Sequence, residues 1–438
     1  LIQSGAAHLD RDPVSGAITN LVIGNTVETR VYNAFGELTN LSVRCNTTNV
    51  MQFSYTRDRL GRIIQSIELA PGSGRTNSYV YDLAGRLAQV APTGMPSSVY
   101  QYDSNGNRTN ASIAGQPVAA VYDAQDRLVN YGAVVCAYDA DGELTNTVVG
   151  STNTAYQYDA LGRLCGAMPP GPTNITYKLD ARGRRIAKFA DGVFQQGFLY
   201  RDGLRPIAEL DSVTNVVSIF VYGSRVNVPD YMIRGGTVYR IIADHLGSVR
   251  LVANAVSGAL VQRIDYDEFG RILQDTNPGF QPFGFAGGLY DKDTGLVHFG
   301  AREYDPNTGR WTRRDPILFR GSAANLYAYC ANDPLNAVDR TGTGPDTSPQ
   351  QPVPGLPGRS LTEIIQEATE DGTTEGLSNG DSSTEADRQS QLDDLRREIE
   401  ELKTLQEQLK EQESMRGKAN NLEWMQEDRE RQGNAHLG

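Results

Sequence analysis

The first 270 residues alternate short runs of strand-forming residues with tight-turn sequences. The runs, such as residues 97–102, are rich in Val, Thr, Tyr and Asn, and β-branched and aromatic residues favour strands. The turns start with Asp or Asn and have Gly three positions later, as at Asp82 and Gly85, except that Asp126 replaces the glycine in one copy. The Asp side chain can bond its own backbone there, and Gly accepts the positive φ that other residues resist. Two runs joined by such a turn predict a β-hairpin of about 20 residues, at roughly 3.3 Å of rise per residue.

A repeated motif marks these turns: Tyr, usually followed by Asp, then two variable residues and Gly-Arg or Gly-Glu. Copies start at Tyr32, Tyr81, Tyr102, Tyr122, Tyr138, Tyr158 and Tyr266. From Tyr81 to Leu179, which replaces the tyrosine in one copy, they lie 21, 20, 16, 20 and 21 residues apart. A single hairpin is marginally stable, so this period predicts hairpins stacked edge to edge in one continuous sheet. An ordinary β-sandwich with Asp-x-x-Gly turns is the alternative, and the shared phase of Tyr, Gly and Arg favours the array.

The composition suits a Gly-rich β protein, with 45 Gly and 21 Tyr in 438 residues. The 39% hydrophobic share is low for one compact globule and predicts a strip of sheet with two solvated faces. A net charge of −12 argues against a nucleic-acid partner, and no apolar run approaches the length of a membrane span. The chain begins inside repeat-like sequence, so we expect a longer protein whose targeting signal is not in this fragment.

Neither cysteines nor histidines cluster along the chain. The cysteines are Cys45, Cys136, Cys165 and Cys330, and the histidines are His8, His245, His298 and His436. Their spacing matches neither a metal site nor a disulfide framework. We therefore expect separate small core cysteines, no structural metal and no cofactor.

Residues 240–343 carry a denser series of motifs. They are DHLGSVR at 244–250, YDEFGR at 266–271, FGFAGG at 283–288, DTGLVHF at 293–299, AREYDPNTGRW at 301–311, RDP at 314–316, NLYAY at 325–329, NDP at 332–334 and DRTG at 339–342. In this order, and together with the upstream repeats, they resemble the Rhs (YD-repeat) family and its repeat-associated core domain. The resemblance covers residues 20–343.

The resemblance implies a spiral sheet of hairpins that forms a hollow shell, with the core domain as its terminal plug. Bacterial members, similar to the C subunits of insecticidal toxin complexes, enclose a C-terminal polypeptide that is often a toxin. In many members the core domain also cuts the chain just after itself, with two aspartates and an arginine in an aspartyl-protease-like arrangement.

Carried over to this chain, the cleavage residues are Arg302, Asp315 and Asp339, and the scissile bond follows Thr343. One carboxylate would activate a water as base, and the other, protonated, would polarise the scissile carbonyl. Arginine would hold one carboxylate ionised. The chain departs from the family pattern, because Arg340 replaces the proline after Asp339, the first motif lacks its glycine, and Thr343 stands where leucine is typical.

The alternative is that both aspartates are simple turn residues and that Arg302 only pairs with an acidic neighbour. We expect the nearby aromatic residues Trp311, Tyr327 and Tyr329 to pack in the core and not to form a ligand platform.

The sequence after the core domain changes abruptly. Residues 344–384 are rich in Pro, Gly, Ser, Thr and acidic side chains and predict a disordered linker. Residues 385–417 predict a helix whose apolar positions recur every three or four residues, as in a coiled coil. A single solvated amphipathic helix is the alternative. Residues 418–438 are a polar tail, and nothing after residue 343 pairs a nucleophile with a base.

The expected protein is mainly β: a YD-repeat hairpin array in residues 1–239, forming a curved or spiral sheet, then a core domain in 240–343. Its predicted function is a shell fragment of an Rhs-type polymorphic toxin or secreted protein, at most a single-turnover aspartyl-type autoprotease. The alternatives are a secreted or cell-surface module binding glycans or proteins, and a toxin precursor with an atypical tail.

The expected partners are the chain's own C-terminal segment, the missing N-terminal part of the shell, a coiled-coil partner of residues 385–417, and a glycan or protein ligand. The expected location is secreted or on the bacterial cell surface. Nine or so hairpins, each adding about 10 Å of sheet width, are too few to enclose a folded domain, so we expect an open, curved sheet.

Overall fold

The computed structural model describes residues 2–4, 6–321 and 324–346, all within one compact unit, Leu1–Glu370. The helix predicted at 385–417, the polar tail at 418–438 and all but the first three residues of the linker predicted at 344–384 lie outside the described residues.

The described residues form a 27-stranded sheet in which each strand pairs antiparallel with the next one along the chain. The first half comprises β1 (Ile2–Ser4), β2 (Ala7–Arg11), β3 (Ile18–Ile23), β4 (Thr26–Tyr32), β5 (Leu38–Cys45), β6 (Thr48–Arg57), β7 (Ile63–Ala70), β8 (Ser73–Tyr81), β9 (Leu87–Pro92), β10 (Ser98–Tyr102), β11 (Arg108–Ile113), β12 (Gln116–Tyr122), β13 (Leu128–Tyr131) and β14 (Val134–Tyr138). The second half comprises β15 (Leu144–Val149), β16 (Thr152–Tyr158), β17 (Leu164–Met168), β18 (Ile175–Leu179), β19 (Arg185–Ala190), β20 (Val193–Tyr200), β21 (Pro206–Leu210), β22 (Val216–Val221), β23 (Tyr231–Arg234), β24 (Thr237–Ala243), β25 (Val249–Asn254), β26 (Leu260–Tyr266) and β27 (Ile272–Asp275).

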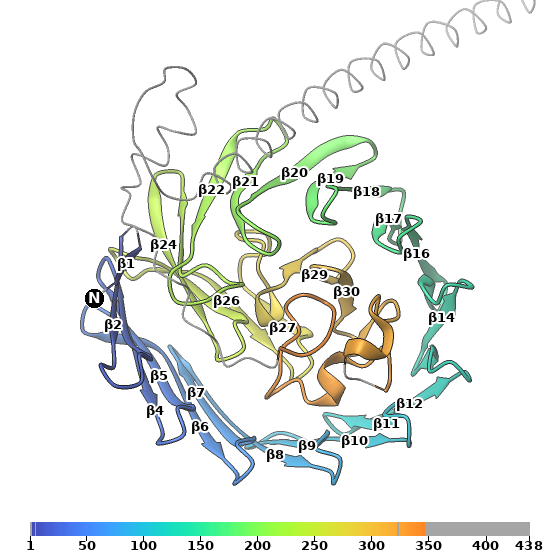
Figure 1. The fold of residues 1–438 in the computed structure, drawn as a ribbon, viewed down its shortest axis with the longest axis horizontal. Helices are drawn as coiled ribbons and strands as arrows, with labels where there is room; N and C mark the ends of the chain where they lie inside the picture. The colour runs from blue at the N-terminus through green and yellow to red at the C-terminus, as the bar shows by residue number, and fades with distance from the viewer. Residues whose placement is uncertain (1, 5, 322–323, 347–438) are drawn as a thin grey trace, which may run out of the picture. The chain divides into compact units, whose positions relative to one another are not determined.

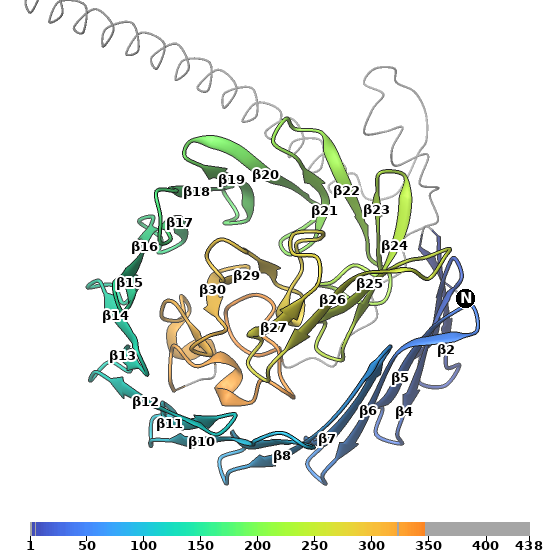
Figure 2. The same cartoon turned by 180° about the vertical axis from the view of Figure 1, so that it is seen from behind.

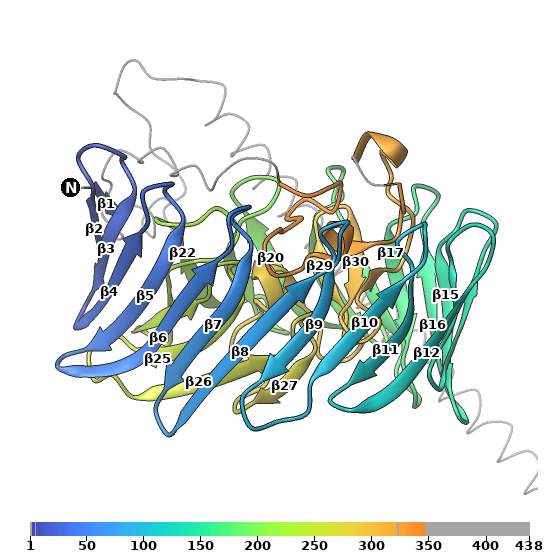
Figure 3. The same cartoon turned by 90° about the horizontal axis from the view of Figure 1, so that it is seen from below.

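The sheet curves round and then turns inward (Figures 1 and 2). Its strands stand side by side along the wall, as Figure 3 shows. The end of the sheet packs inside its beginning, because Ile242 and Leu251 share one apolar cluster with Leu41 and Phe53. The sheet is not closed, which confirms the predicted open, curved, continuous array. The domain boundary predicted between residues 239 and 240 falls inside β24, so the repeats and the core share this sheet.

Residues 280–346, called the core segment below, fill the space that the wall curves around (Figure 1). The segment holds a four-stranded sheet of β28 (Leu289–Tyr290), β29 (Val297–Phe299), β30 (Arg302–Asp305) and β31 (Arg310–Trp311), and the 3₁₀ helices η1 (Phe285–Gly287), η2 (Leu318–Gly321) and η3 (Tyr329–Asn332). Trp311, Tyr327 and Tyr329 are buried, as expected for core packing. The expectation of two solvated sheet faces is wrong for strands such as β10, whose residues alternate between buried and exposed, because Tyr100 packs in an apolar cluster with Leu335 of the core segment.

Each turn motif closes on its own aspartate, or on Asn33 in the first copy. In the copy at Tyr81, Oδ1 of Asp82 accepts the N–H groups of Ala84 and Arg86, both at 2.9 Å. The Arg86 guanidinium returns to Oδ2 of Asp82 through Nε at 2.6 Å. Gly85 takes the left-handed conformation, with φ +84°, that completes the turn.

The same residues join each hairpin to its neighbour. The hydroxyl of Tyr102 donates to the carbonyl of Leu87 in the preceding hairpin, at 2.7 Å. The Arg86 guanidinium lies over the Tyr102 ring, 4.7 Å from its centroid, and donates to the carbonyl of Asp103. Equivalent hydroxyl-to-carbonyl bonds join Tyr32 to Ile18, Tyr81 to Ile63, Tyr122 to Arg108, Tyr200 to Arg185 and Tyr222 to Pro206. The repeated motif therefore encodes both the turn and the contact between hairpins.

The core segment is held against the wall by polar contacts at separate hairpins. Asn336 accepts the N–H of Ile63 at 2.8 Å, and the Tyr327 hydroxyl donates to the carbonyl of Gly142 at 2.8 Å. Beside Gly142, a β-bridge pairs Glu143 with Arg313 of the core segment. These contacts anchor the segment inside the curve of the sheet.

Replacing Tyr102 by Phe removes the hydroxyl that donates to the Leu87 carbonyl. We expect the free energy of unfolding to fall by about 1 kcal/mol, measured as a lower midpoint of urea denaturation. Tyr266→Phe is the matched control, because Tyr266 has the same motif position and its buried hydroxyl has no hydrogen-bond partner in the described part of the chain. An equal fall in both variants would contradict this role of the Tyr102 hydroxyl.

The contact at Glu143 predicts a pH dependence. Burial, with a hydrogen bond to Asp139 and the charge of that carboxyl, raises the pKa of Glu143 from its usual 4.5 to about 7, against the opposing charge of Arg313. The folded state therefore holds a proton that the unfolded chain releases, so stability falls as the pH rises from 4.5 through 7.

We expect Glu143→Gln to flatten this slope when denaturation midpoints are measured across that pH range. Glu37→Gln, at the same motif position in the first copy, should leave the slope unchanged. Parallel slopes in wild type and Glu143→Gln would show that another group carries the pH dependence.

Candidate functional site

Three side chains predicted to act together come from separate parts of the core segment. Arg302 is the first residue of β30, Asp315 lies between β31 and η2, and Asp339 follows η3. All three are buried, with 3%, 5% and 1% of their surface exposed. Buried charges need partners, so their mutual arrangement decides what the site can do.

Arg302 binds both carboxylates through a single nitrogen. Its Nη2 lies 2.9 Å from Oδ2 of Asp315 and 3.0 Å from Oδ2 of Asp339. Its guanidinium also stacks on Trp311, 4.1 Å from the ring centroid. The structure thus brings the three predicted residues into one cluster.

The predicted scissile peptide lies against Asp339. Oδ1 of Asp339 accepts the N–H of Thr343 at 3.1 Å, and Oδ2 accepts the N–H of Gly344 at 2.8 Å. Nε of Arg302 donates to the carbonyl of Gly342 at 2.6 Å. The nitrogen of the Thr343–Gly344 bond is therefore in direct contact with one of the two carboxylates.

Gly342 lets the chain pass this close to β29 and β30. Its φ is +68°, and a Cβ there would lie 2.3 Å from the carbonyl oxygen of Phe299 and 2.8 Å from the nitrogen of Arg302. Any larger residue would push the segment away from the cluster. The glycine of the closing motif thus has a steric role in positioning Thr343.

Burial shifts the pKa of two groups in the cluster. Burial raises the pKa of Asp339, while Arg302 and the N–H groups of Gly344 and Thr343 oppose the rise. Burial lowers the pKa of Arg302, and the two carboxylates oppose that shift, so the guanidinium stays charged. Burial therefore favours a proton on Asp339, next to the cation of Arg302.

The turn interpretation of the aspartates also has support. Oδ1 of Asp315 accepts the N–H of Ile317 at 2.9 Å, and its carbonyl accepts the N–H of Leu318. Leu318 stands where the family has glycine and has a φ of +55°, a conformation that costs a branched side chain about 1 kcal/mol. Asp315 therefore shapes a strained turn and binds Arg302 at the same time.

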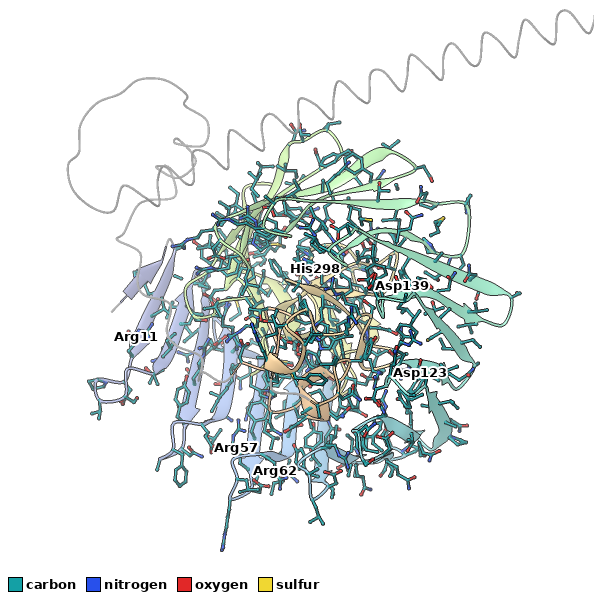
Figure 4. The ribbon with its side chains drawn as sticks, turned by 45° about the vertical axis from the view of Figure 1, so that its right-hand side comes forward. Arg11, Arg57, Arg62, Asp123, Asp139 and His298 are labelled. Carbon is teal, nitrogen blue, oxygen red and sulfur yellow. The ribbon has the colours of Figure 1, made fainter. Side chains whose placement is uncertain are left out.

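A second buried charge network, next to this cluster, was not found from the sequence. Glu303 contacts Nδ1 of His298 at 2.6 Å and Arg185 of the wall at 3.0 Å. Although burial alone would raise it, Arg185 and His298 hold the pKa of Glu303 below its usual value. Figure 4 places His298 toward the middle of the ring, inside the wall strands. No local signal marks this network, because the wall partner Arg185 lies 118 residues before Glu303 along the chain.

The described residues contain no group of three or more His, Cys, Asp or Glu side chains placed to hold a metal ion. All four cysteines are free. No helix in the described ranges has the length and apolar character needed to cross a membrane.

The fold and the arrangement of the core segment define a YD-repeat shell protein. A family model described as the teneurin YD-shell matches residues 8–335. The chain belongs to this teneurin YD-shell family.

Relatives and solved structures agree with this assignment. Teneurin-4 of Homo sapiens is 28% identical over 339 residues, and Teneurin-1 of Gallus gallus is 29% identical over 339 residues. These alignments cover 74% and 73% of this chain, and the chain spans only 12% of each relative. The crystal structure of TcdB2-TccC3-Cdc42 has a TM-score of 0.55 at 16% identity, covering 76% of this chain and 19% of that one. That likeness concerns the fold alone.

We expect Arg302→Gln to lower the free energy of unfolding by about 3 kcal/mol, because it leaves two buried carboxylates without their cation. The measurement is the urea denaturation midpoint. Adding Asp315→Asn and Asp339→Asn should recover part of the loss. Arg271→Gln, in an arginine–aspartate pair whose arginine side chain is 45% exposed, is the control and should change stability by less than about 0.5 kcal/mol. A wild-type midpoint for Arg302→Gln would contradict the pairing.

Proposed function

We propose that this chain builds the curved wall and the plug of a YD shell that encloses polypeptide. Membership of the teneurin YD-shell family supports the shell role. The inward turn of the sheet and the core segment packed inside it support the assignment of that segment as the plug. The cavities between plug and wall, of about 440 and 480 Å³, are far too small for a folded domain. We therefore do not propose that the described wall encloses a folded domain.

We further propose that the core segment cuts its own chain once, between Thr343 and Gly344. The observation that carries this proposal is the 2.8 Å contact between Oδ2 of Asp339 and the Gly344 nitrogen, within a carboxylate pair bridged by Arg302.

The chemistry follows from this placement. Asp315, ionised beside Arg302, takes a proton from a water that attacks the carbonyl carbon of Thr343. Asp339, protonated, gives its proton to the Gly344 nitrogen as the carbon–nitrogen bond breaks. The water oxygen ends in the new carboxyl group of Thr343, and Gly344 becomes a free amine. One proton then remains on the carboxylate pair, as before the reaction.

The test is the intact mass of the full chain, followed from expression through days of storage. We expect fragments corresponding to residues 1–343 and 344–438. Asp315→Asn and Asp339→Asn should each slow their appearance by about 100-fold or more, because each variant removes one proton-transfer group.

Asp333→Asn is the matched control, because Asp333 also precedes a proline in the core segment but bonds Asn336 and not Arg302. It should cleave at the wild-type rate. A chain that stays whole, with the Asp315 and Asp339 variants indistinguishable from it, would overturn the cleavage proposal and leave the shell proposal standing.

We also propose a secreted or cell-surface location for the protein. A glycan- or protein-binding role, a toxin precursor and a coiled-coil partner for residues 385–417 remain predictions from the sequence. None of them has a specific contact among the described residues to favour it.

A further inference from the structure

A cavity of about 440 Å³ lies between the turn ends of the wall hairpins and the core segment. Its lining contains five arginines and no Asp or Glu among the described residues: Arg163, Arg182, Arg184, Arg313 and Arg340. The other lining residues are mainly small or apolar. This one-sided charge is not a general property of the chain, whose net charge is −12.

The turn motif itself brings arginines to this cavity. Arg163 and Arg184 occupy the motif position after Gly, and each is oriented by its own aspartate, Asp159 or Asp180, at 2.7 and 2.5 Å. Those aspartates are not part of the lining. The guanidinium groups of Arg163 and Arg184 are therefore held in position by these ion pairs, which reduces the entropy lost when they bind an anion.

Two buried polar atoms indicate what kind of ligand fits. Nε of Arg313, whose residue is 8% exposed, has no hydrogen-bond partner within the described structure. Oδ1 of Asn227, whose residue is 6% exposed, also has none there. The first atom needs an acceptor and the second needs a donor. A polypeptide with acidic side chains supplies both carboxylates and N–H groups, whereas a sulfate dianion supplies acceptors only.

The last described residues of the chain lie beside the cavity. Arg340 and Thr341 line it, and Oδ2 of Asp346 already binds Nε of Arg340 at 2.7 Å. Residues 344–384 contain seven acidic side chains and one basic side chain. Glu363 follows Asp346 by 17 residues, and an extended chain of that length reaches up to roughly 55 Å, so the acidic residues from 363 to 381 can return to the cavity.

We propose that the arginine-lined cavity binds carboxylate side chains of residues 363–381 of its own chain. The inference rests on the proposed enclosure of polypeptide by the shell, and it specifies a site and the chemistry by which the chain's own C-terminal segment would be held. After cleavage at Thr343, these ionic contacts would help to hold the cut segment, beside the hydrogen bond from the Asp346 N–H to the Val338 carbonyl. Its release would therefore depend on ionic strength.

The test uses a full-length chain in which the acidic segment is neutral: Glu363→Gln, Glu367→Gln, Glu370→Gln, Asp371→Asn, Glu375→Gln and Asp381→Asn. Asp315→Asn is included in every chain so that self-cleavage does not enter. A fluorescent synthetic peptide of residues 360–384 is titrated into this chain and into the chain with its native acidic segment, and fluorescence anisotropy is recorded. A peptide with the same six neutral substitutions is the second probe.

We expect the acidic peptide to bind the neutralised chain at least 5-fold more tightly than the native-segment chain, because a tethered segment competes at high effective concentration. Adding Arg163→Gln and Arg182→Gln should weaken binding at least 5-fold. Arg86→Gln, at the motif position of a hairpin outside the cavity, is the matched control and should leave it unchanged. Denaturation midpoints show that each variant is folded.

Three outcomes would overturn the inference: equal binding of the neutral peptide, equal losses from the cavity and Arg86 variants, or no loss from the cavity variants. Displacement of the peptide by inorganic phosphate, beyond the effect of chloride at equal ionic strength, would also overturn it in favour of a small-anion site. If the peptide binds but the unsubstituted chain does not cleave itself, this inference stands and the cleavage proposal fails. If the chain cleaves itself but the peptide does not bind, the cleavage proposal stands and this inference fails.

Discussion

The contact between successive hairpins is the interaction on which the rest of this structure depends. A hairpin of this size is only marginally stable alone in water. Backbone pairing between strands does not by itself determine the register, or which face of each hairpin lies on the inside of the sheet. The tyrosine hydroxyl bonded to the preceding hairpin's carbonyl, with the arginine stacked on the same ring, supplies both. Because every motif residue belongs to the turn or to this contact, the period near 20 residues is preserved even where individual residues change.

One such change coincides with a contact to another part of the chain. Glu143 replaces the motif arginine where the wall meets Arg313 of the core segment. Likewise, the curve of the sheet is completed by side chains and not by strand pairing. The buried Glu28 near the start of the wall binds Arg240 of β24 and Arg30 of its own strand. A buried ion pair contributes little net stability but penalises misaligned packing, which suits a joint between two surfaces that share no hydrogen-bonded strands.

The core segment supplies both the side chains that pack inside the wall and the cluster of Arg302 with two aspartates. Its aromatic cluster around Tyr304 and Trp311 holds β30 in place, and Arg302 at the start of that strand then gathers two aspartates and the carbonyl of Gly342. The same arrangement stabilises the fold and fixes the chain end beside a carboxylate pair. Structural and chemical roles therefore coincide in Arg302, and neither excludes the other.

The sequence alone determined what is local or periodic. Tyr, Asp and Gly at fixed spacing specify turns and hairpins through φ preferences and side-chain bonds within five residues, and the motif order indicated the cluster of Arg302, Asp315 and Asp339. Only the tertiary structure decided which distant surfaces meet. The pairing of Arg185 with Glu303, the inward turn of β25 to β27 and the arginines gathered around one cavity depend on the curvature of the whole sheet. The curvature is the accumulated twist between neighbouring strands over all 27 strands of the sheet. It therefore cannot be predicted from any short stretch of sequence.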